Sequence, residues 1–86
     1  MRSIKHKTPQ FNAVFRPEPE GGFTVLVPSL PGCVSYGKTL TEAKKMIIDA
    51  IKGYIISMKK NGEKIPSDES SFVSLISFQE ISLRNA

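Results

Sequence analysis

The amino-acid sequence predicts a small α+β domain with four strands and one helix, in the order β-β-β-α-β. Short apolar runs with alternating side chains occur early in the chain and again near its end. Residues typical of turns lie on either side of each run. Between them lies a longer segment with apolar residues at helical spacing. The 86 residues suffice for one domain with a small core. We expect this domain to span residues 10–80, between a flexible basic tail at 1–9 and a C-terminal tail at 81–86.

The first three strands are predicted from alternation and from turn residues. Gln10–Arg16 and Phe23–Val27 place apolar side chains at every second position, which is typical of half-buried strands. Pro17–Gly22 is rich in proline and glycine, so we expect a turn and an antiparallel hairpin. The prolines within Pro28–Gly32 cannot donate to a strand ladder. This connector therefore ends the second strand and directs a third, Cys33–Tyr36.

A helix is predicted to begin after Thr39 and to end near Lys60. Thr39 and Glu42 have capping-box spacing: the hydroxyl can accept from the amide of Glu42, and the carboxylate can reach the amide of Thr39. Asn61 and Gly62 form a strong helix stop, and lysines precede them at the negative end of the helix dipole. A core-facing stripe recurs at helical spacing: Leu40, Ala43, Ile47, Ala50, Ile51, Tyr54 and Met58.

A fourth strand is predicted over Phe72–Phe78, which is rich in β-branched and aromatic residues. Its apolar residues fall on both faces, which indicates an interior strand or a covered edge. A right-handed crossover through the helix would place this strand parallel to the first. The sequence therefore predicts a mixed four-stranded sheet of order 3-2-1-4, with the helix packed on one face.

Composition narrows the class of protein. The net charge of +4 is compatible with nucleic-acid binding, but Arg2, Lys5 and Lys7 in the N-terminal tail supply much of it. A single cysteine cannot form an internal disulfide, which favours a reducing cytoplasm over secretion. The sequence has one cysteine and one histidine, which do not occur at the spacing of metal ligands. No apolar run is long enough to span a bilayer. We expect a cytoplasmic protein without a metal, a cofactor or membrane contact.

Several motifs occur together along the chain: Gly21-Gly-Phe23, Val27-Pro-Ser-Leu-Pro-Gly-Cys33, Gly37-Lys-Thr39, Thr41-Glu-Ala43 and Ala50-Ile51. In combination they resemble the HicB-like antitoxin family, from Phe11 to Phe78. The resemblance implies a partial ribonuclease-H-like fold that binds and blocks a HicA-like toxin, a small mRNA-cleaving ribonuclease. Many family members add a C-terminal DNA-binding domain. This sequence ends at Ala86, so we expect a minimal, antitoxin-only form or a stand-alone relative with another partner, and we disfavour direct DNA binding.

Catalytic chemistry is disfavoured by the residues present. Ribonuclease-H-like catalysis needs carboxylates gathered around a divalent metal, one of them normally on the first strand. Gln10–Arg16 contains no acid. Cys33 as a nucleophile would need a base, and the only histidine, His6, lies in the tail. We interpret Cys33 as a small buried residue and expect that the protein is not an enzyme. A metal-dependent nuclease is the weakest of three functional hypotheses.

The outer face of the predicted helix is the expected partner-binding surface. At about 100° per residue, a set of mostly charged residues falls together opposite the core stripe. The set comprises Glu42, Lys45, Asp49, Lys52 and Ile56. An ordinary solvated face is the alternative interpretation. A contact patch is indicated by the apolar Ile56 among charges, and carboxylates would attract a basic ribonuclease.

The sequence also bears on the oligomeric state and on nucleic-acid binding. An exposed edge of the third or fourth strand could pair with another copy, which favours a dimer or a higher homo-oligomer. The second functional hypothesis is a nucleic-acid-binding regulator that uses the basic N-terminal tail. No aromatic residue is interleaved with the charges of that tail to stack on bases. The antitoxin interpretation is therefore preferred.

Overall fold

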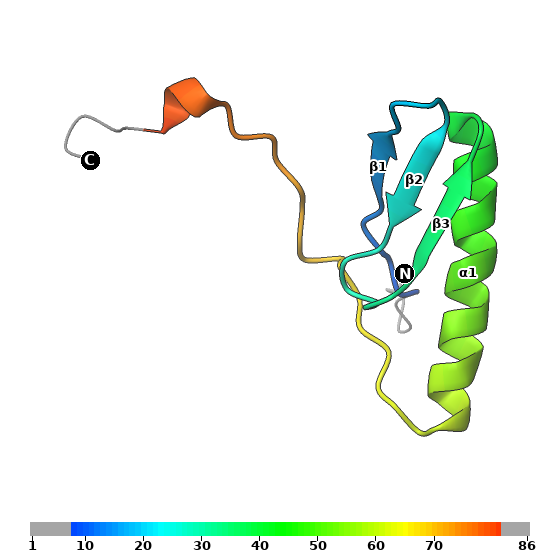
Figure 1. Cartoon of the computed structure of the whole chain (residues 1–86). Coiled ribbons are helices and arrows are strands. Elements are labelled where there is room, and N and C mark those ends of the chain that lie inside the picture. Colours follow the sequence, from blue (N-terminus) through cyan, green and yellow to red (C-terminus); the bar gives the residue numbers. More distant parts are fainter. Residues whose placement is uncertain (1–7, 82–86) are drawn as a thin grey trace, which may run out of the picture.

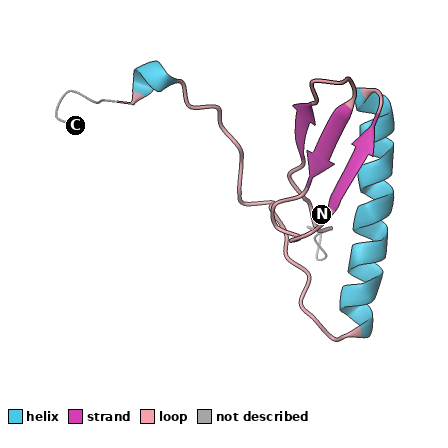
Figure 2. Cartoon of the chain, in the orientation of Figure 1, coloured by secondary structure: helices cyan, strands magenta, loops and turns pink. Residues whose placement is uncertain are grey.

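The computed structural model describes residues 8–81 and confirms the α+β class. Its main elements are strands β1 (Val14–Pro17), β2 (Phe23–Leu26) and β3 (Val34–Gly37) and helix α1 (Leu40–Lys60). The strands form an antiparallel sheet of order β1-β2-β3, and the helix packs on β3 and β2 (Figure 1). A short 3-10 helix, η1 (Phe78–Glu80), follows a long loop (Figure 2). The predicted hairpins and the predicted helix are thus confirmed.

Strand β1 is shorter than the predicted Gln10–Arg16, because its partner strand ends first. Val14 pairs with Leu26, the last residue of β2, and the connector that follows begins with Pro28. Residues before Val14 therefore lack an antiparallel neighbour. Their backbone groups bond instead to residues 67–68, far along the chain.

The predicted fourth strand over Phe72–Phe78 is not formed, and the sheet is three-stranded and antiparallel rather than four-stranded and mixed. After α1 the chain returns towards the sheet and then runs away from it (Figure 1). Strand propensity needs a sheet edge to pair with. Here the amide of Ser71 donates to the carbonyl of Asp68 (2.8 Å), and this turn precedes the departure of the chain from β1. The order 3-2-1 is confirmed, whereas the fourth position and the ribonuclease-H-like topology are not.

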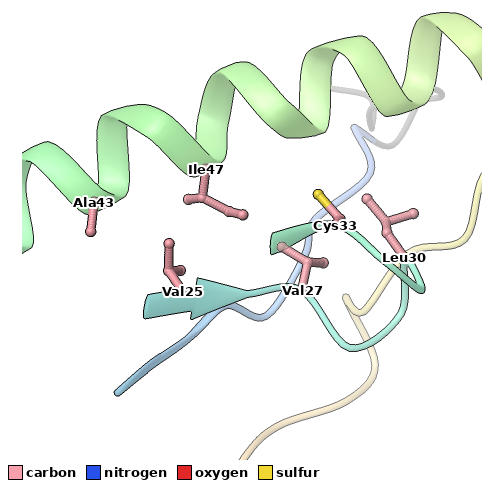
Figure 3. Packing of buried hydrophobic residues seen from close by; sticks show 6 residues of the cluster. All are labelled: Val25, Val27, Leu30, Cys33, Ala43 and Ile47. Carbon is pink, nitrogen blue, oxygen red and sulfur yellow. The ribbon is translucent and has the colours of Figure 1, made fainter. Parts of the chain in front are cut away.

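The hydrophobic core is small and lies between the helix and the sheet (Figure 3). It is formed by six buried residues from β2, the following connector and α1: Val25, Val27, Leu30, Cys33, Ala43 and Ile47. Tyr54 and Met58 pack against this cluster, as the core-facing stripe predicts. Leu40 differs from the prediction, because it lies at the first helical position and is exposed.

The connector between β2 and β3 acts as scaffold. Its backbone is closed by hydrogen bonds from the Val27 amide to the Cys33 carbonyl (3.1 Å) and from the Leu30 amide to the Val27 carbonyl (3.0 Å). The Leu30 side chain is buried in the core. The Tyr54 hydroxyl donates to the carbonyl of Pro31 (2.7 Å), which joins the connector to the helix. These contacts confirm that Pro28–Gly32 positions the next elements.

The ends of α1 follow local capping rules with one difference. The Thr39 hydroxyl accepts from the amide of Glu42 (3.0 Å), as predicted. The Glu42 carboxylate accepts from the amide of Lys38 (2.7 Å) instead of the amide of Thr39. At the other end, the amide of Asn61 bonds to carbonyls of the last turn, and Gly62 adopts a left-handed φ of 70°.

Candidate functional site

The expected partner-binding residues all lie on the exposed side of α1. This surface, termed the outer helix face, comprises Glu42, Lys45, Asp49, Lys52 and Ile56. The helix brings them onto one side because Ala43 and Ile47 turn the opposite side to the sheet (Figure 3). Ile56 is 61% exposed, which is high for a large apolar residue. Contact between this face and a partner remains a prediction.

The two carboxylates of the outer helix face have different surroundings. Glu42 lies in the first turn, and its carboxylate accepts from the amide of Lys38 at 2.7 Å. That bond satisfies a backbone donor next to the helix start, so Glu42 has a structural role. Asp49 lies in the middle of the helix between Lys45 and Lys52, and it is exposed. Asp49 is therefore the better candidate for an ion pair with a basic partner.

A shallow apolar hollow lies along the helix and overlaps the outer helix face at Lys52 and Ile56, and only part of its lining was named from the sequence. Its lining consists of Ile48, Ile51, Lys52, Ile55 and Ile56. The signal for it is composition, because α1 carries more isoleucines than one core-facing stripe can bury. We refer to Ile48, Ile51 and Ile55 as the apolar helix flank.

The sheet face that is turned away from the helix also carries apolar side chains. Val14 pairs with Leu26, and Leu26 pairs with Val34, so these side chains form a row across the strands. Val14 and Val34 are exposed, and Leu26 is half-buried. This row was not predicted because it depends on the strand register. Contiguous exposed apolar groups of this kind mark interaction surfaces.

Asp68 fastens the chain after α1 to the residues that lead into β1. Its backbone amide donates to the carbonyl of Gln10 (2.7 Å). Its carboxylate accepts from the amide of Asn12 (2.8 Å) and from the hydroxyl of Ser29 (2.7 Å). These bonds lower the pKa of the Asp68 carboxyl, because they stabilise its charged form. The bond from the Asn12 amide has the larger effect, and the bond from the Ser29 hydroxyl has the smaller one. We term this arrangement the Asp68 clamp.

We predict that acid opens the Asp68 clamp. Because the folded pKa of Asp68 lies below its unfolded value of about 3.9, the clamp stabilises the fold above that pH. The contribution is lost as the pH falls through the folded pKa. The amide-proton resonance of Asn12, followed by NMR, should shift with an apparent pKa below about 3.9. The variant Asp68→Asn serves as the control and should remove this titration. An Asn12 signal that titrates equally in both proteins would contradict the assignment.

The structure places the remaining candidate residues as follows. Cys33 is buried, and burial raises the pKa of its thiol, which disfavours the nucleophilic thiolate. His6 and the basic residues of the N-terminal tail lie outside the described residues. Within residues 8–81, no cluster of three or more histidine, cysteine or acidic side chains could hold a metal ion. Over the same range, no helix has both the length and the apolarity needed to cross a bilayer.

Exposed apolar surfaces on a small helix-on-sheet domain are typical of proteins that bind another protein. Residues 11–81 match the family described as HicB-like antitoxin of bacterial toxin-antitoxin systems. Because the match covers most of the chain, this protein belongs to the HicB-like antitoxin family. Membership suggests a toxin-antitoxin role, a toxin as partner and a function other than catalysis.

Curated relatives are similar to this chain over most of its domain. A UPF0150 protein of Thermoplasma acidophilum is 39% identical over 66 residues, which cover 77% of this chain and 96% of the relative. A UPF0150 protein of Archaeoglobus fulgidus is 39% identical over 54 residues, covering 63% of this chain and 77% of the relative. A 14.9 kDa protein of Haemophilus phage HP1 is 42% identical over 45 residues, covering 52% of this chain and 34% of the relative.

Proposed function

We propose that this protein is the antitoxin of a type II toxin-antitoxin pair and neutralises a HicA-like mRNA-cleaving toxin by covering it directly. The observation that carries the proposal is the family match over residues 11–81. The exposed apolar surfaces support direct binding, because a chain that acts by contact must present a surface that gains from burial. The pair would act in the cytoplasm, where mRNA is translated.

Co-expression tests this function. The toxin to be tested is a HicA-like protein, sought as a small basic reading frame next to the gene of this protein. Its expression alone should arrest growth, and expression of this chain from a second plasmid should restore growth. A copy of this chain with an early stop codon is the matched control and should not restore growth. If the intact chain leaves the arrest unchanged while both proteins accumulate, the antitoxin proposal is wrong.

We further propose that the outer helix face contacts the toxin. A toxin that binds RNA presents basic groups that grip phosphate, and Asp49 could occupy those groups. Ile56, which is exposed on the same face, supplies apolar surface next to the charge. The lysines at positions 45 and 52 flank Asp49 and would lie at the rim of the contact, where charge affects the association rate more than affinity.

The substitution Asp49→Lys tests this surface. It replaces the central carboxylate by a third lysine, so we expect toxin affinity to fall roughly 10-fold or more, since charge reversal adds repulsion from a basic partner. Isothermal titration calorimetry measures the affinity, and circular dichroism checks that the helix is retained. Glu20→Lys makes the same change in net charge in the turn between β1 and β2 and is the matched control. Equal affinities for the two variants would remove Asp49 from the interface.

The partial ribonuclease-H-like fold belongs to the same proposal. The order β1-β2-β3 followed by α1 supplies its first part, and a further strand beside β1 would complete it. We propose that such a fold serves here as a binding scaffold without nuclease activity.

The alternative function is a nucleic-acid-binding regulator that uses the basic N-terminal tail. Arg2, Lys5 and Lys7 lie outside the described residues, so the alternative rests on their charge alone. Duplex DNA binding that weakens steeply with salt would favour it over the antitoxin proposal.

A further inference from the structure

The segment 72–78 exposes its apolar side chains to solvent. Leu75 is 93% exposed and Phe72 is 85% exposed, and Val73, Ile76 and Phe78 are exposed as well. Figure 1 shows the segment extending away from the sheet and the helix. The radius of gyration of 16.8 Å exceeds the about 12 Å expected for a compact chain of this length. Single exposed apolar residues are ordinary, but a contiguous run of them marks a surface that is covered by a partner.

The sheet has an unfilled position beside β1. Strand β1 lies at the edge of the sheet and pairs only with β2 in the described part of the chain. Phe15 of β1 lines a hollow together with Leu40 and Lys44, so this side of the helix faces the β1 side of the sheet. The apolar helix flank continues along the same side, because Ile48, Ile51 and Ile55 follow Lys44 at helical spacing. A strand added beside β1 would therefore lie next to the exposed Ile48 and the half-buried Ile51 and Ile55.

The segment 72–78 has the pattern that this position requires. Phe72, Ile76 and Phe78 alternate with Val73 and Leu75, so both faces of an extended segment would be apolar. One face would meet the apolar helix flank, and the other would extend the row formed by Val14, Leu26 and Val34. A strand that is apolar on both faces is typical of a covered position in a sheet.

The Asp68 clamp holds the base of the segment beside the residues that lead into β1. The amide of Asp68 donates to the carbonyl of Gln10 (2.7 Å), and the amide of Gln10 donates to the hydroxyl of Ser67 (3.1 Å). The turn from Asp68 to Ser71 follows directly, and the chain then extends away from the sheet and the helix (Figure 1). The position beside β1 and the segment that fits it are thus present in one chain but are separated.

We propose that segment 72–78 adds as a strand to β1 of a second copy of this chain, and that the second copy returns the same contact. Each copy would fill the vacant edge of the other and cover its apolar helix flank, in a reciprocal two-fold exchange. The structure favours a second copy as the occupant. One chain carries both the free edge of β1 and the segment that fits it, and the two lie apart within that chain. The exchange also removes an unpaired sheet edge from each copy, which otherwise favours aggregation. This inference does not depend on the proposed function.

Light scattering on the full chain tests the exchange. At micromolar concentration the mass should be twice the 9.5 kDa of one chain. Leu75→Asp should weaken the dimer by at least about 10-fold, because it places a charge in the apolar contact. The side chain is 93% exposed in the single chain, so the monomer fold should be unaffected. Ser70→Asp adds the same charge before the segment and should leave the dimer intact. A monomeric mass for the unchanged chain, or a dimer that persists in Leu75→Asp, would overturn the proposal.

A disulfide distinguishes exchange from docking within one chain. Within one chain, continuing the pairing of Asp68 beside Gln10 in parallel register would bring Ser74 beside Arg16. An exchange that keeps this register places Ser74 beside Arg16 of the second copy. The double variant Arg16→Cys with Ser74→Cys, oxidised and run on a non-reducing gel, should therefore migrate as a covalent dimer. Each single variant reports any background reaction, including that of the buried Cys33. A disulfide closed within one chain would refute the exchange, because it would show that the segment pairs with β1 of the same chain.

Discussion

Replacement of Gly37 by alanine should lower the melting temperature by roughly 10–20 °C, equivalent to about 2–3 kcal/mol. Gly37 ends β3 and is buried against the start of α1. A Cβ atom at this position would overlap the backbone N and Cα of Ala43. Backbone atoms cannot turn aside as a flexible side chain can, so the helix would have to move off the sheet. Thermal unfolding followed by circular dichroism measures the effect.

The helix supplies a matched control for this substitution. Gly53 lies within α1, and a Cβ at that position meets no atom within 4 Å. Gly53→Ala should therefore raise stability by up to about 1 kcal/mol, because alanine favours the helix over glycine. Opposite signs for the two variants would confirm that close approach of β3 and α1 sets the requirement at position 37. Equal melting temperatures for Gly37→Ala and the unchanged chain would contradict it.

Leu30→Ala should destabilise the fold by about 2–5 kcal/mol, a large part of the about 5–15 kcal/mol expected for a whole domain. Leu30 is 1% exposed and is among the largest fully buried side chains. It comes from the connector, whose backbone is already closed by local hydrogen bonds and cannot collapse freely into a cavity. The measurement is urea unfolding followed by circular dichroism, with the slope compared between variants.

Leu40→Ala is the matched control for this change, since it removes the same atoms from an exposed position at the start of α1. We expect it to cost less than about 1 kcal/mol. If the two alanine variants unfold at the same urea concentration, Leu30 does not anchor the core and the connector is not the scaffold described above.

The helix and the hairpins could be predicted from the sequence because their signals are local. Thr39 before the helix and Gly62 after it determine its ends through groups that lie within one turn. Alternation over Phe23–Val27 placed Val25 and Val27 in the core without knowledge of any other element. Where a signal was only partly local, the prediction was partly right: Glu42 reaches a backbone amide at the helix start, but that amide belongs to Lys38.

The fourth strand could not be predicted in the same way. The pattern of Phe72–Phe78 indicates that this segment suits a covered position in a sheet. The pattern does not indicate whether that position belongs to the same chain or to another one. The start of β1 depends similarly on a distant residue, because pairing ends where Leu26 gives way to the connector with Pro28. These features are set by pairing between segments far apart in sequence, and no periodicity within one segment records that pairing.

For the candidate site, helical periodicity correctly placed the outer helix face in solvent, whereas its role as a binding surface is still a prediction. Of the apolar helix flank, only Ile51 was named from the sequence, because we assigned each helix residue either to the core or to the opposite side. Ile48 and Ile55 lie between these sides. The Asp68 clamp was also missed, because its partners Asn12 and Ser29 are distant in sequence and become neighbours only in the folded chain.

The extended course of segment 72–78 also bears on how long the protein survives in a cell. A protease needs a stretch of chain that it can hold in an extended form, and exposed segments without secondary structure are preferred sites of cleavage. A segment paired with a second copy would be shielded, whereas the same segment in a single copy would be open. Dilution would then expose each chain to cleavage, so that its lifetime would rise and fall with its own concentration.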